Sequence, residues 1–172
     1  MHQLEFLKQI YSLLKNPKQE SLNLSMADTH HQDLFSLVID GVEFGKLTRV
    51  FIASKKLSPF EVQFHTHRYP IRLTVIKGIV RHFTAKGVAA KTVETVTLSE
   101  FDYKSPLNGG SGLSYCGEKS IIIQEHTIPV GGVISMDETE FHTVSCSKGS
   151  MWIVEELGFK TDSSKVLGVP FV

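Results

Sequence analysis

The sequence is poor in cysteine, in charge of one sign and in long apolar runs, and each lack excludes a class of protein. Its two cysteines, Cys116 and Cys146, are too few for a disulfide scaffold, so we expect reduced thiols and a cytoplasmic protein. Lys plus Arg (18) equals Asp plus Glu (18), so the basic field of a nucleic-acid or anionic-membrane binder is missing. No apolar run reaches the ~18–20 residues of a transmembrane helix, and the first sixteen residues lack the apolar core of a signal peptide.

The length of 172 residues suits one domain with a substantial core. Residues 2–15 are predicted to form a helix, because Leu4, Leu7, Tyr11 and Leu14 recur at helical spacing. We expect this helix to pack on the domain or on a partner, since its polar face is not basic enough for a membrane surface. We divide the chain into a helix and linker at 1–33, with His30 and His31 on the solvated surface, and one domain at 34–172.

From residue 34 onward the apolar pattern changes to that of short strands. Strands are expected at 34–39, 42–53, 61–67, 70–77, 79–84, 92–98, 120–128, 132–136, 141–146 and 150–156, with glycine turns between most of them. Many short strands and few helices indicate a sandwich or barrel. The segment 103–120 is predicted to be a long lid or binding loop. The tail from Gly158 is expected to wrap the domain or a second subunit.

Histidines stand out within this β-rich part of the chain. His65 and His67 are two residues apart, so in a strand they share a face and are about 6–7 Å apart along the backbone. Neutral imidazoles are common ligands of zinc, iron, copper and nickel. A lone pair of this kind is weak support for a metal, since it also fits an exposed strand face. His142 lies near the start of a later predicted strand, after a Gly-Gly turn and an acidic turn. Taken alone, it also fits an ordinary core or surface histidine.

Taken together, the segments 59–78 and 131–146 resemble the two motifs of the cupin superfamily. The first, G-x5-H-x-H-x3or4-E-x6-G, is matched at His65, His67 and Gly78. The second, G-x5-P-x-G-x2-H-x3-N, is matched at Gly131 and His142. The resemblance covers roughly residues 60–156 and implies an all-β fold, the cupin double-stranded β-helix or jelly roll, here with an N-terminal α-helix. It also implies that a homodimer is a common assembly, which the neutral net charge allows.

The chain departs from these motifs where a carboxylate ligand is expected. Ile71 stands at the position of the motif's Glu, and Arg72 at the neighbouring alternative. What remains is a set of three histidines, His65, His67 and His142. Among cupins this set is similar to that of thiol dioxygenases, which implies one divalent metal ion, most simply Fe(II), with Zn, Ni or Mn as alternatives. Three imidazoles leave the +2 charge intact and leave positions for dioxygen and an anionic substrate.

Six further residues are candidates for the site. Tyr69, His82 and His126 are candidate catalytic groups, because strand alternation places them on inward faces near the histidines. A rim aromatic or a hydrogen-bonded core histidine is the competing interpretation of each. Arg49, Arg72 and Gln124 are candidate substrate contacts, the arginines because guanidinium groups clamp carboxylates. Solvated or paired surface side chains are the alternative for these three.

Three functions compete. The first is a mononuclear non-haem iron dioxygenase acting on a small polar or thiol-containing molecule. The second is a non-redox metal-dependent cupin, such as an isomerase, lyase or hydrolase. The third is a non-catalytic cupin that binds a small molecule, and the fold alone does not choose among them.

Overall fold

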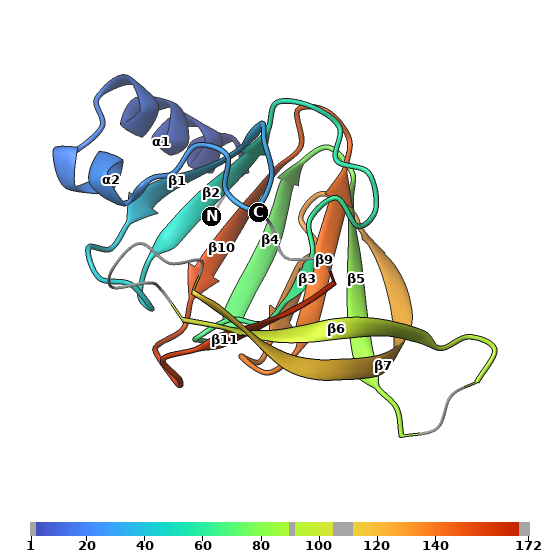
Figure 1. The fold of residues 1–172 in the computed structure, drawn as a ribbon. Helices are drawn as coiled ribbons and strands as arrows, with labels where there is room; N and C mark the ends of the chain where they lie inside the picture. Colours follow the sequence, from blue (N-terminus) through green and yellow to red (C-terminus); the bar gives the residue numbers. More distant parts are fainter. Residues whose placement is uncertain (1–2, 90–91, 105–111, 169–172) are drawn as a thin grey trace.

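The fold is built almost entirely from antiparallel strands, with two helices at its N-terminal end (Figure 1). The computed structural model describes residues 3–89, 92–104 and 112–168. The helices are α1 (Gln3–Lys15) and α2 (Gln19–Leu24). The strands are β1 (Leu34–Asp40), β2 (Thr48–Ala53), β3 (Phe64–His65), β4 (Ile71–Lys77), β5 (Val80–Gly87), β6 (Val96–Tyr103), β7 (Leu113–Ile128), β8 (Val133–Met136), β9 (Phe141–Cys146), β10 (Met151–Glu156) and β11 (Ser164–Leu167). None of the described helices is long and apolar enough to cross a membrane.

The strands form two sheets. One has five strands in the order β1-β2-β10-β4-β8, and the other closes on itself in the order β11-β3-β9-β5-β7-β6. Strands that are distant in the sequence are therefore neighbours: β10 lies between β2 and β4, and β9 lies between β3 and β5. This crossing connectivity is typical of a jelly roll. The expected all-β jelly roll with an N-terminal helix is confirmed.

The main core fills the space between the sheets. Strand β10 shows how it is made, because alternate side chains point inward and bury Trp152, Val154 and Glu156. Trp152 and Val154 meet Val144 from the opposite sheet within one continuous apolar cluster. Ile71, which replaces the motif's carboxylate, is 1% exposed and belongs to this cluster. Position 71 is thus part of the core: Ile71 supplies no metal ligand where the motif has Glu, and it adds an apolar side chain to the core.

Helix α1 covers the outer face of the five-stranded sheet (Figure 1). Its Ile10 is buried against Val50 and Ile76, with Leu7 packed beside them. The predicted helix is therefore confirmed to within one residue, and its apolar face is used by the domain itself. The following segment was expected to be irregular, but it contains the short helix α2. No residue of α2 is buried, so no apolar periodicity announces it.

Strand pairing tests two predictions about the C-terminal half of the chain. The segment 103–120 was expected to be a loop, but β7 already begins at Leu113 and pairs with β6 as far as Tyr103. Glycine and serine residues hide the apolar–polar alternation in this part of the sequence, and hydrogen bonding to β6 makes it a strand. Residues 105–111 of the expected loop lie outside the described part of the chain. The tail does wrap the domain, since β11 pairs with both β3 and β6.

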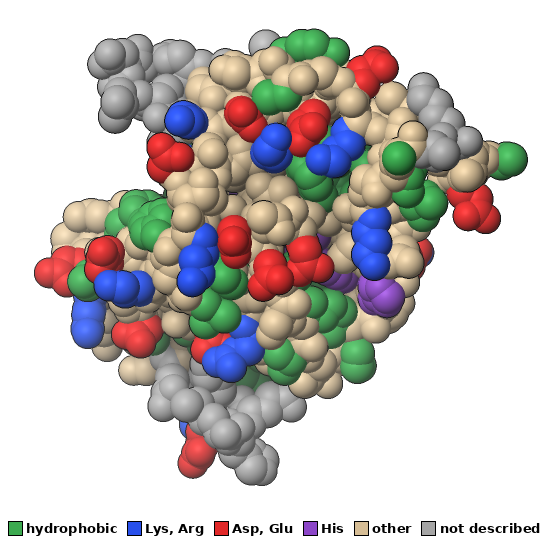
Figure 2. All heavy atoms as spheres, turned by 90° about the horizontal axis from the view of Figure 1, so that it is seen from below, with side chains coloured by type: hydrophobic (Ala, Val, Ile, Leu, Met, Phe, Trp, Pro, Cys, Tyr) green, Lys and Arg blue, Asp and Glu red, His purple; other side chains and the backbone are tan. Residues whose placement is uncertain are grey.

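Charges of both signs alternate over the lower face of the molecule (Figure 2). The closed sheet contains ion pairs between strands. Glu100 lies 3.3 Å from the ammonium group of Lys119 and 3.1 Å from that of Lys165. Charge within this sheet is therefore partly balanced locally, which fits the zero net charge of the sequence.

Candidate metal centre

Three histidines from two parts of the sequence meet at the end of the closed sheet. His65 ends β3 and lies directly opposite His142 of β9 in the strand register, while His67 follows two residues after His65. The ring centroids lie 5.0 Å apart for His65 and His67, 4.7 Å for His65 and His142, and 4.9 Å for His67 and His142. One ring nitrogen from each histidine lies within 4.8 Å of the other two. The structure thus brings together the three predicted ligands.

Hydrogen bonds orient the rings of His65 and His142. Nδ1 of His65 lies 2.9 Å from the carbonyl oxygen of Gln63, so Nδ1 carries the proton and Nε2 is left as a lone-pair donor. Nδ1 of His142 lies 3.1 Å from Nε2 of His82, which is itself 3.1 Å from the sulfur of Met136. Nε2 of His142 is left facing Nε2 of His67 at 2.8 Å. Each ring therefore has one nitrogen directed into the cluster.

Burial and mutual repulsion keep these rings neutral. Burial lowers the pKa of His142 well below its ordinary value, and the neighbouring His65 and His67 lower it further. Burial is also the main cause of the lowered pKa of His67 and of His65. A neutral imidazole is the form that binds a metal ion, because the lone pair is free.

The donor set fits a divalent metal ion. Three uncharged nitrogen ligands suit the borderline ions zinc, ferrous iron, nickel and copper, whereas magnesium and calcium require oxygen ligands. Within the described residues, the cluster contains no carboxylate. One buried polar atom is unsatisfied behind it: Nδ1 of His82, which has no hydrogen-bond partner. The site therefore has the composition and convergence of a three-histidine metal centre.

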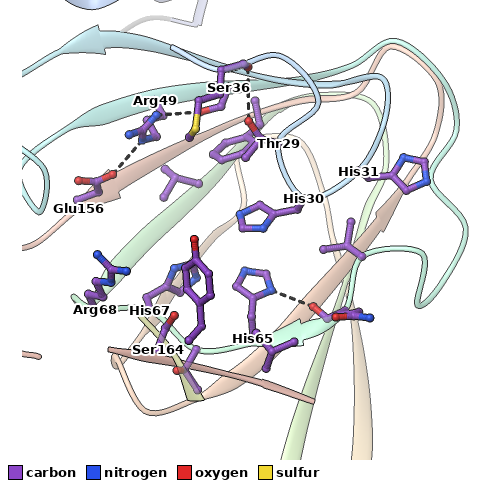
Figure 3. Close-up of a pocket in the computed structure, with 18 of the residues that line it drawn as sticks. Thr29, His30, His31, Ser36, Arg49, His65, His67, Arg68, Glu156 and Ser164 are labelled. Atoms are coloured by element: carbon purple, nitrogen blue, oxygen red, sulfur yellow. Dashed lines mark hydrogen bonds and ion pairs between the residues drawn. The ribbon is translucent and has the colours of Figure 1, made fainter. Parts of the chain in front are cut away.

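A cavity of about 790 Å³ opens beside this cluster (Figure 3). His65 and His67 form part of its wall. Aromatic and aliphatic side chains form much of the rest: Phe44, Phe51, Val62, Tyr69, Tyr103, Leu113, Val154, Phe159 and Val166. The space is large enough for a small organic molecule in contact with a metal.

Two predicted site residues, Tyr69 and Arg49, line the cavity and share one partner, Glu156. The Tyr69 hydroxyl donates to Oε1 of Glu156 at 2.9 Å, and Nε of Arg49 donates to the same oxygen at 2.9 Å. Burial and the Glu156 charge raise the pKa of Tyr69, so the phenol stays protonated. Tyr69 also lies nearly parallel to the ring of His67, with centroids 6.1 Å apart. The catalytic role of Tyr69 and the substrate contact of Arg49 remain predictions.

The other predicted residues lie away from the cavity. His82 is 1% exposed and contacts the far edge of His142, so it supports a ligand from behind. Gln124 and His126 lie on β7 within a run of four exposed residues, 124–127. Arg72 pairs with Glu155 on the exposed surface. The structure does not bring Gln124, His126 or Arg72 into the cavity wall.

Three residues of the cavity were missed by sequence reasoning. His30 is exposed, as expected, but it also lines the cavity and stacks on His65 with centroids 4.6 Å apart and an interplanar angle of 20°. No periodicity marks it, because it lies in an irregular segment. Glu156 was detectable, since the alternation of β10 places it on the inward face. Arg68 directly follows His67 and lines the cavity, whereas Arg49 and Arg72 were the arginines preferred as substrate contacts.

The comparisons with known proteins give no family for this chain. No family model matches the sequence, and no curated protein matches it. Among solved structures, hydroxypropylphosphonic acid epoxidase from S. wedmorenis is similar with a TM-score of 0.46 and 12% identity, over 77% of this chain and 56% of that one. A hydroquinone 1,2-dioxygenase in complex with Cd2+ and 4-hydroxybenzonitrile is similar with a TM-score of 0.36 and 14% identity, over 72% and 62%.

This chain therefore spans less than two thirds of either similar structure. Similarities of this size do not transfer an activity to this chain.

Proposed function

We propose that this chain is a mononuclear non-haem iron dioxygenase that acts on a small organic acid. The observation that carries the proposal is the convergence of His65, His67 and His142 beside a large cavity. Bound ferrous iron supplies a centre at which dioxygen and substrate meet. Three neutral ligands leave its +2 charge uncompensated, which favours a substrate that carries a negative charge.

The cavity lining favours a substrate with an apolar, planar body. The rings of Phe51, Tyr69, Tyr103 and Phe159 contribute to the walls, and about 790 Å³ exceeds what a small thiol acid fills. Aromatic walls bind planar ligands through offset or edge-to-face contacts. We therefore extend the expected small polar or thiol-containing substrate to a larger class, in which an aromatic or other apolar body bears one anionic group.

Arg68 is the arginine best placed to bind that anionic group. It lines the cavity, and its guanidinium lies over the ring of Tyr103 at 5.9 Å. Among the described residues, Arg68 has no ion pair, whereas the other cavity arginine, Arg49, is neutralised by Glu156 at 2.9 Å. A planar guanidinium binds a carboxylate through two parallel hydrogen bonds. Arg68 therefore replaces Arg49 and Arg72 as our preferred substrate clamp.

Tyr69 would contribute by position. Its hydroxyl hydrogen is directed to Glu156, so the phenol oxygen keeps lone pairs that can accept a hydrogen bond from a substrate or a water molecule. Its ring lies against Phe159 at 5.6 Å, and both rings exclude water from that side of the cavity. The residues of this chain would thus bind, orient and desolvate the substrate next to the metal.

The metal assignment is tested by anaerobic metal analysis of the wild type and of the triple variant His65→Ala/His67→Ala/His142→Ala. We expect about one iron per chain in the wild type and none in the variant, which should stay folded because the rings face a cavity. Binding of zinc but not iron would support a non-redox enzyme instead. A wild type that also refuses added iron, zinc, nickel and manganese would end the enzyme proposal and leave a ligand-binding jelly roll.

The substrate assignment is tested by dioxygen uptake in a screen of aromatic, aliphatic and thiol acids with the iron-loaded protein. For an acid that is turned over, Arg68→Met should raise KM roughly 10–100-fold, which corresponds to the loss of one charge-assisted interaction. The matched control is Arg72→Met, whose side chain is half exposed and paired with Glu155. An equal change in both variants, or no change in Arg68→Met, would remove Arg68 from the substrate site.

A further inference from the structure

The segment that precedes the first strand contributes a histidine to the metal centre. Residues 26–33 form no helix or strand beyond one bridge, yet the segment is fixed at both ends. Met26 exchanges two backbone hydrogen bonds with Ser36, at 2.8 and 2.9 Å. The amide of Asp33 donates to the carboxylate of Asp28 at 2.8 Å. The turn between these anchors therefore has a defined shape.

His30 lies at the turn in an unusual backbone conformation. Its φ is +62°, in the left-handed region that residues with a Cβ rarely adopt. The preceding Thr29 is buried, and its amide donates to the carbonyl of Leu34 at 2.8 Å. Backbone conformations of this kind persist where the surrounding structure enforces them, and they are frequent at functional sites. The conformation directs the imidazole of His30 into the cavity.

Within the cavity, His30 covers one face of His65 (Figure 3). The two rings are nearly parallel, with centroids 4.6 Å apart. The hydrogen bond to Gln63 fixes only the edge of the His65 ring, and rotation about the Cβ–Cγ bond is a soft degree of freedom for histidine. A second ring against its face restricts that rotation. His31, the next residue, is turned away from both rings in Figure 3.

The other two ligands have supports of their own. His142 is held by its contact with His82, and His67 lies alongside Tyr69. Each of the three rings therefore has one neighbouring side chain that limits its motion, and His30 completes the set.

We propose that His30 is a positioning residue that fixes the ring of His65 for metal binding by stacking on it. The inference requires the three-histidine metal centre of the proposed function, but it is independent of any oxygenase chemistry. Groups that orient a metal ligand from behind typically contribute ten-fold or more to metal affinity. The helix-and-linker region would then be part of the site and more than an appendage to the domain.

The experiment compares His30→Asn, His30→Phe and the control His31→Asn. Asparagine tolerates the left-handed backbone but removes the ring, whereas phenylalanine keeps a flat ring without nitrogen. Affinity for Co(II) and Zn(II) is measured by competition with a chromophoric chelator, and the melting temperature of each metal-free variant is measured alongside. Neither readout depends on catalytic activity.

We expect His30→Asn to weaken metal binding about ten-fold without lowering the melting temperature, and His30→Phe to restore most of the affinity. His31→Asn should bind like the wild type. Wild-type affinity in His30→Asn would overturn the proposal. Loss in His30→Phe equal to that in His30→Asn would show that the ring nitrogen, not stacking, matters, and would also overturn it. If His65→Ala retains full metal binding as well, the metal centre itself is wrong, which separates failure of the proposed function from failure of this inference.

Discussion

Replacement of Arg49 by methionine should destabilise the fold strongly, because Arg49 and Glu156 form a buried ion pair. Their side chains are 5% and 1% exposed, and Nε of Arg49 lies 2.9 Å from Oε1 of Glu156. The carboxylate also accepts hydrogen bonds from the amides of Gly45 and Leu47, at 2.6 and 3.3 Å, and from the Tyr69 hydroxyl. Removal of the arginine leaves a buried carboxylate with three donors and no counter-charge.

The loss of one partner from a buried ion pair typically costs about 3–5 kcal/mol. The three remaining donors place Arg49→Met at the lower end, about 3 kcal/mol, since they still solvate the carboxylate. In a chain of this length, that loss lowers the melting temperature by roughly 6–12 °C. The assay is urea unfolding of the metal-free protein, followed by tryptophan fluorescence and circular dichroism.

Two controls isolate the cause. Arg72→Met breaks an exposed pair with Glu155 and should change the free energy of unfolding by less than about 1 kcal/mol. The double variant Arg49→Met/Glu156→Gln removes the stranded charge and should recover part of the loss. If Arg49→Met costs no more than Arg72→Met, the buried pair does not hold these strands together, and Arg49 becomes available again as a substrate clamp.

Two further changes test the frame of the site. Gly78→Ala should lower the free energy of unfolding by about 2–3 kcal/mol, measured by urea unfolding. The φ angle of Gly78 is +82°, and the added Cβ would lie 2.9 Å from Cα of Ser150. An unchanged urea midpoint would contradict this close approach. His82→Leu should lower Zn(II) affinity about ten-fold in a chelator competition, because Nδ1 of His142 loses its 3.1 Å contact with His82. His82→Gln should retain more of that affinity. Equal Zn(II) binding by the wild type and both variants would show that His82 does not orient His142.

The sequence predicted the fold because the relevant signals are local. Short runs with strand-like composition mark the strands: β9 and β10 occur at the residues expected, apart from one residue at the start of β10. Turn glycines separate the strands, and helical spacing marks α1. The misassigned elements are those where local signals are weak. Strand β7 begins within a Gly- and Ser-rich stretch, and its order comes from pairing with β6.

The three histidines of the candidate site were predicted for the same reason, and their surroundings were predicted only in part. His65 and His67 are neighbours in the sequence, and His142 has a motif of its own. Alternation also indicated His82 of β5 as a neighbour of this site, whereas His30 comes from the irregular N-terminal turn and was not predicted there. A contact such as that of His30 depends on how the two sheets close, which no spacing rule encodes. The exposure of Gln124 and His126 on β7 is a further consequence of tertiary packing that alternation near Ile128 did not reveal.

Charge explains why the two arginines of the cavity differ in role. Glu156 is on the inward face of β10, and Arg49 neutralises it, so this pair adds no net charge to the cavity. Arg68 retains its positive charge, and a divalent metal at the three neutral histidines would add two more. An anion that enters the cavity would thus be attracted both to Arg68 and to a bound metal, with the carboxylate of Asp28 in the wall as an opposing charge. The same arrangement disfavours cationic ligands. The proposed preference for an apolar molecule with one acidic group therefore rests on Arg68 and on the charge of a bound divalent metal, whichever ion the histidines would hold.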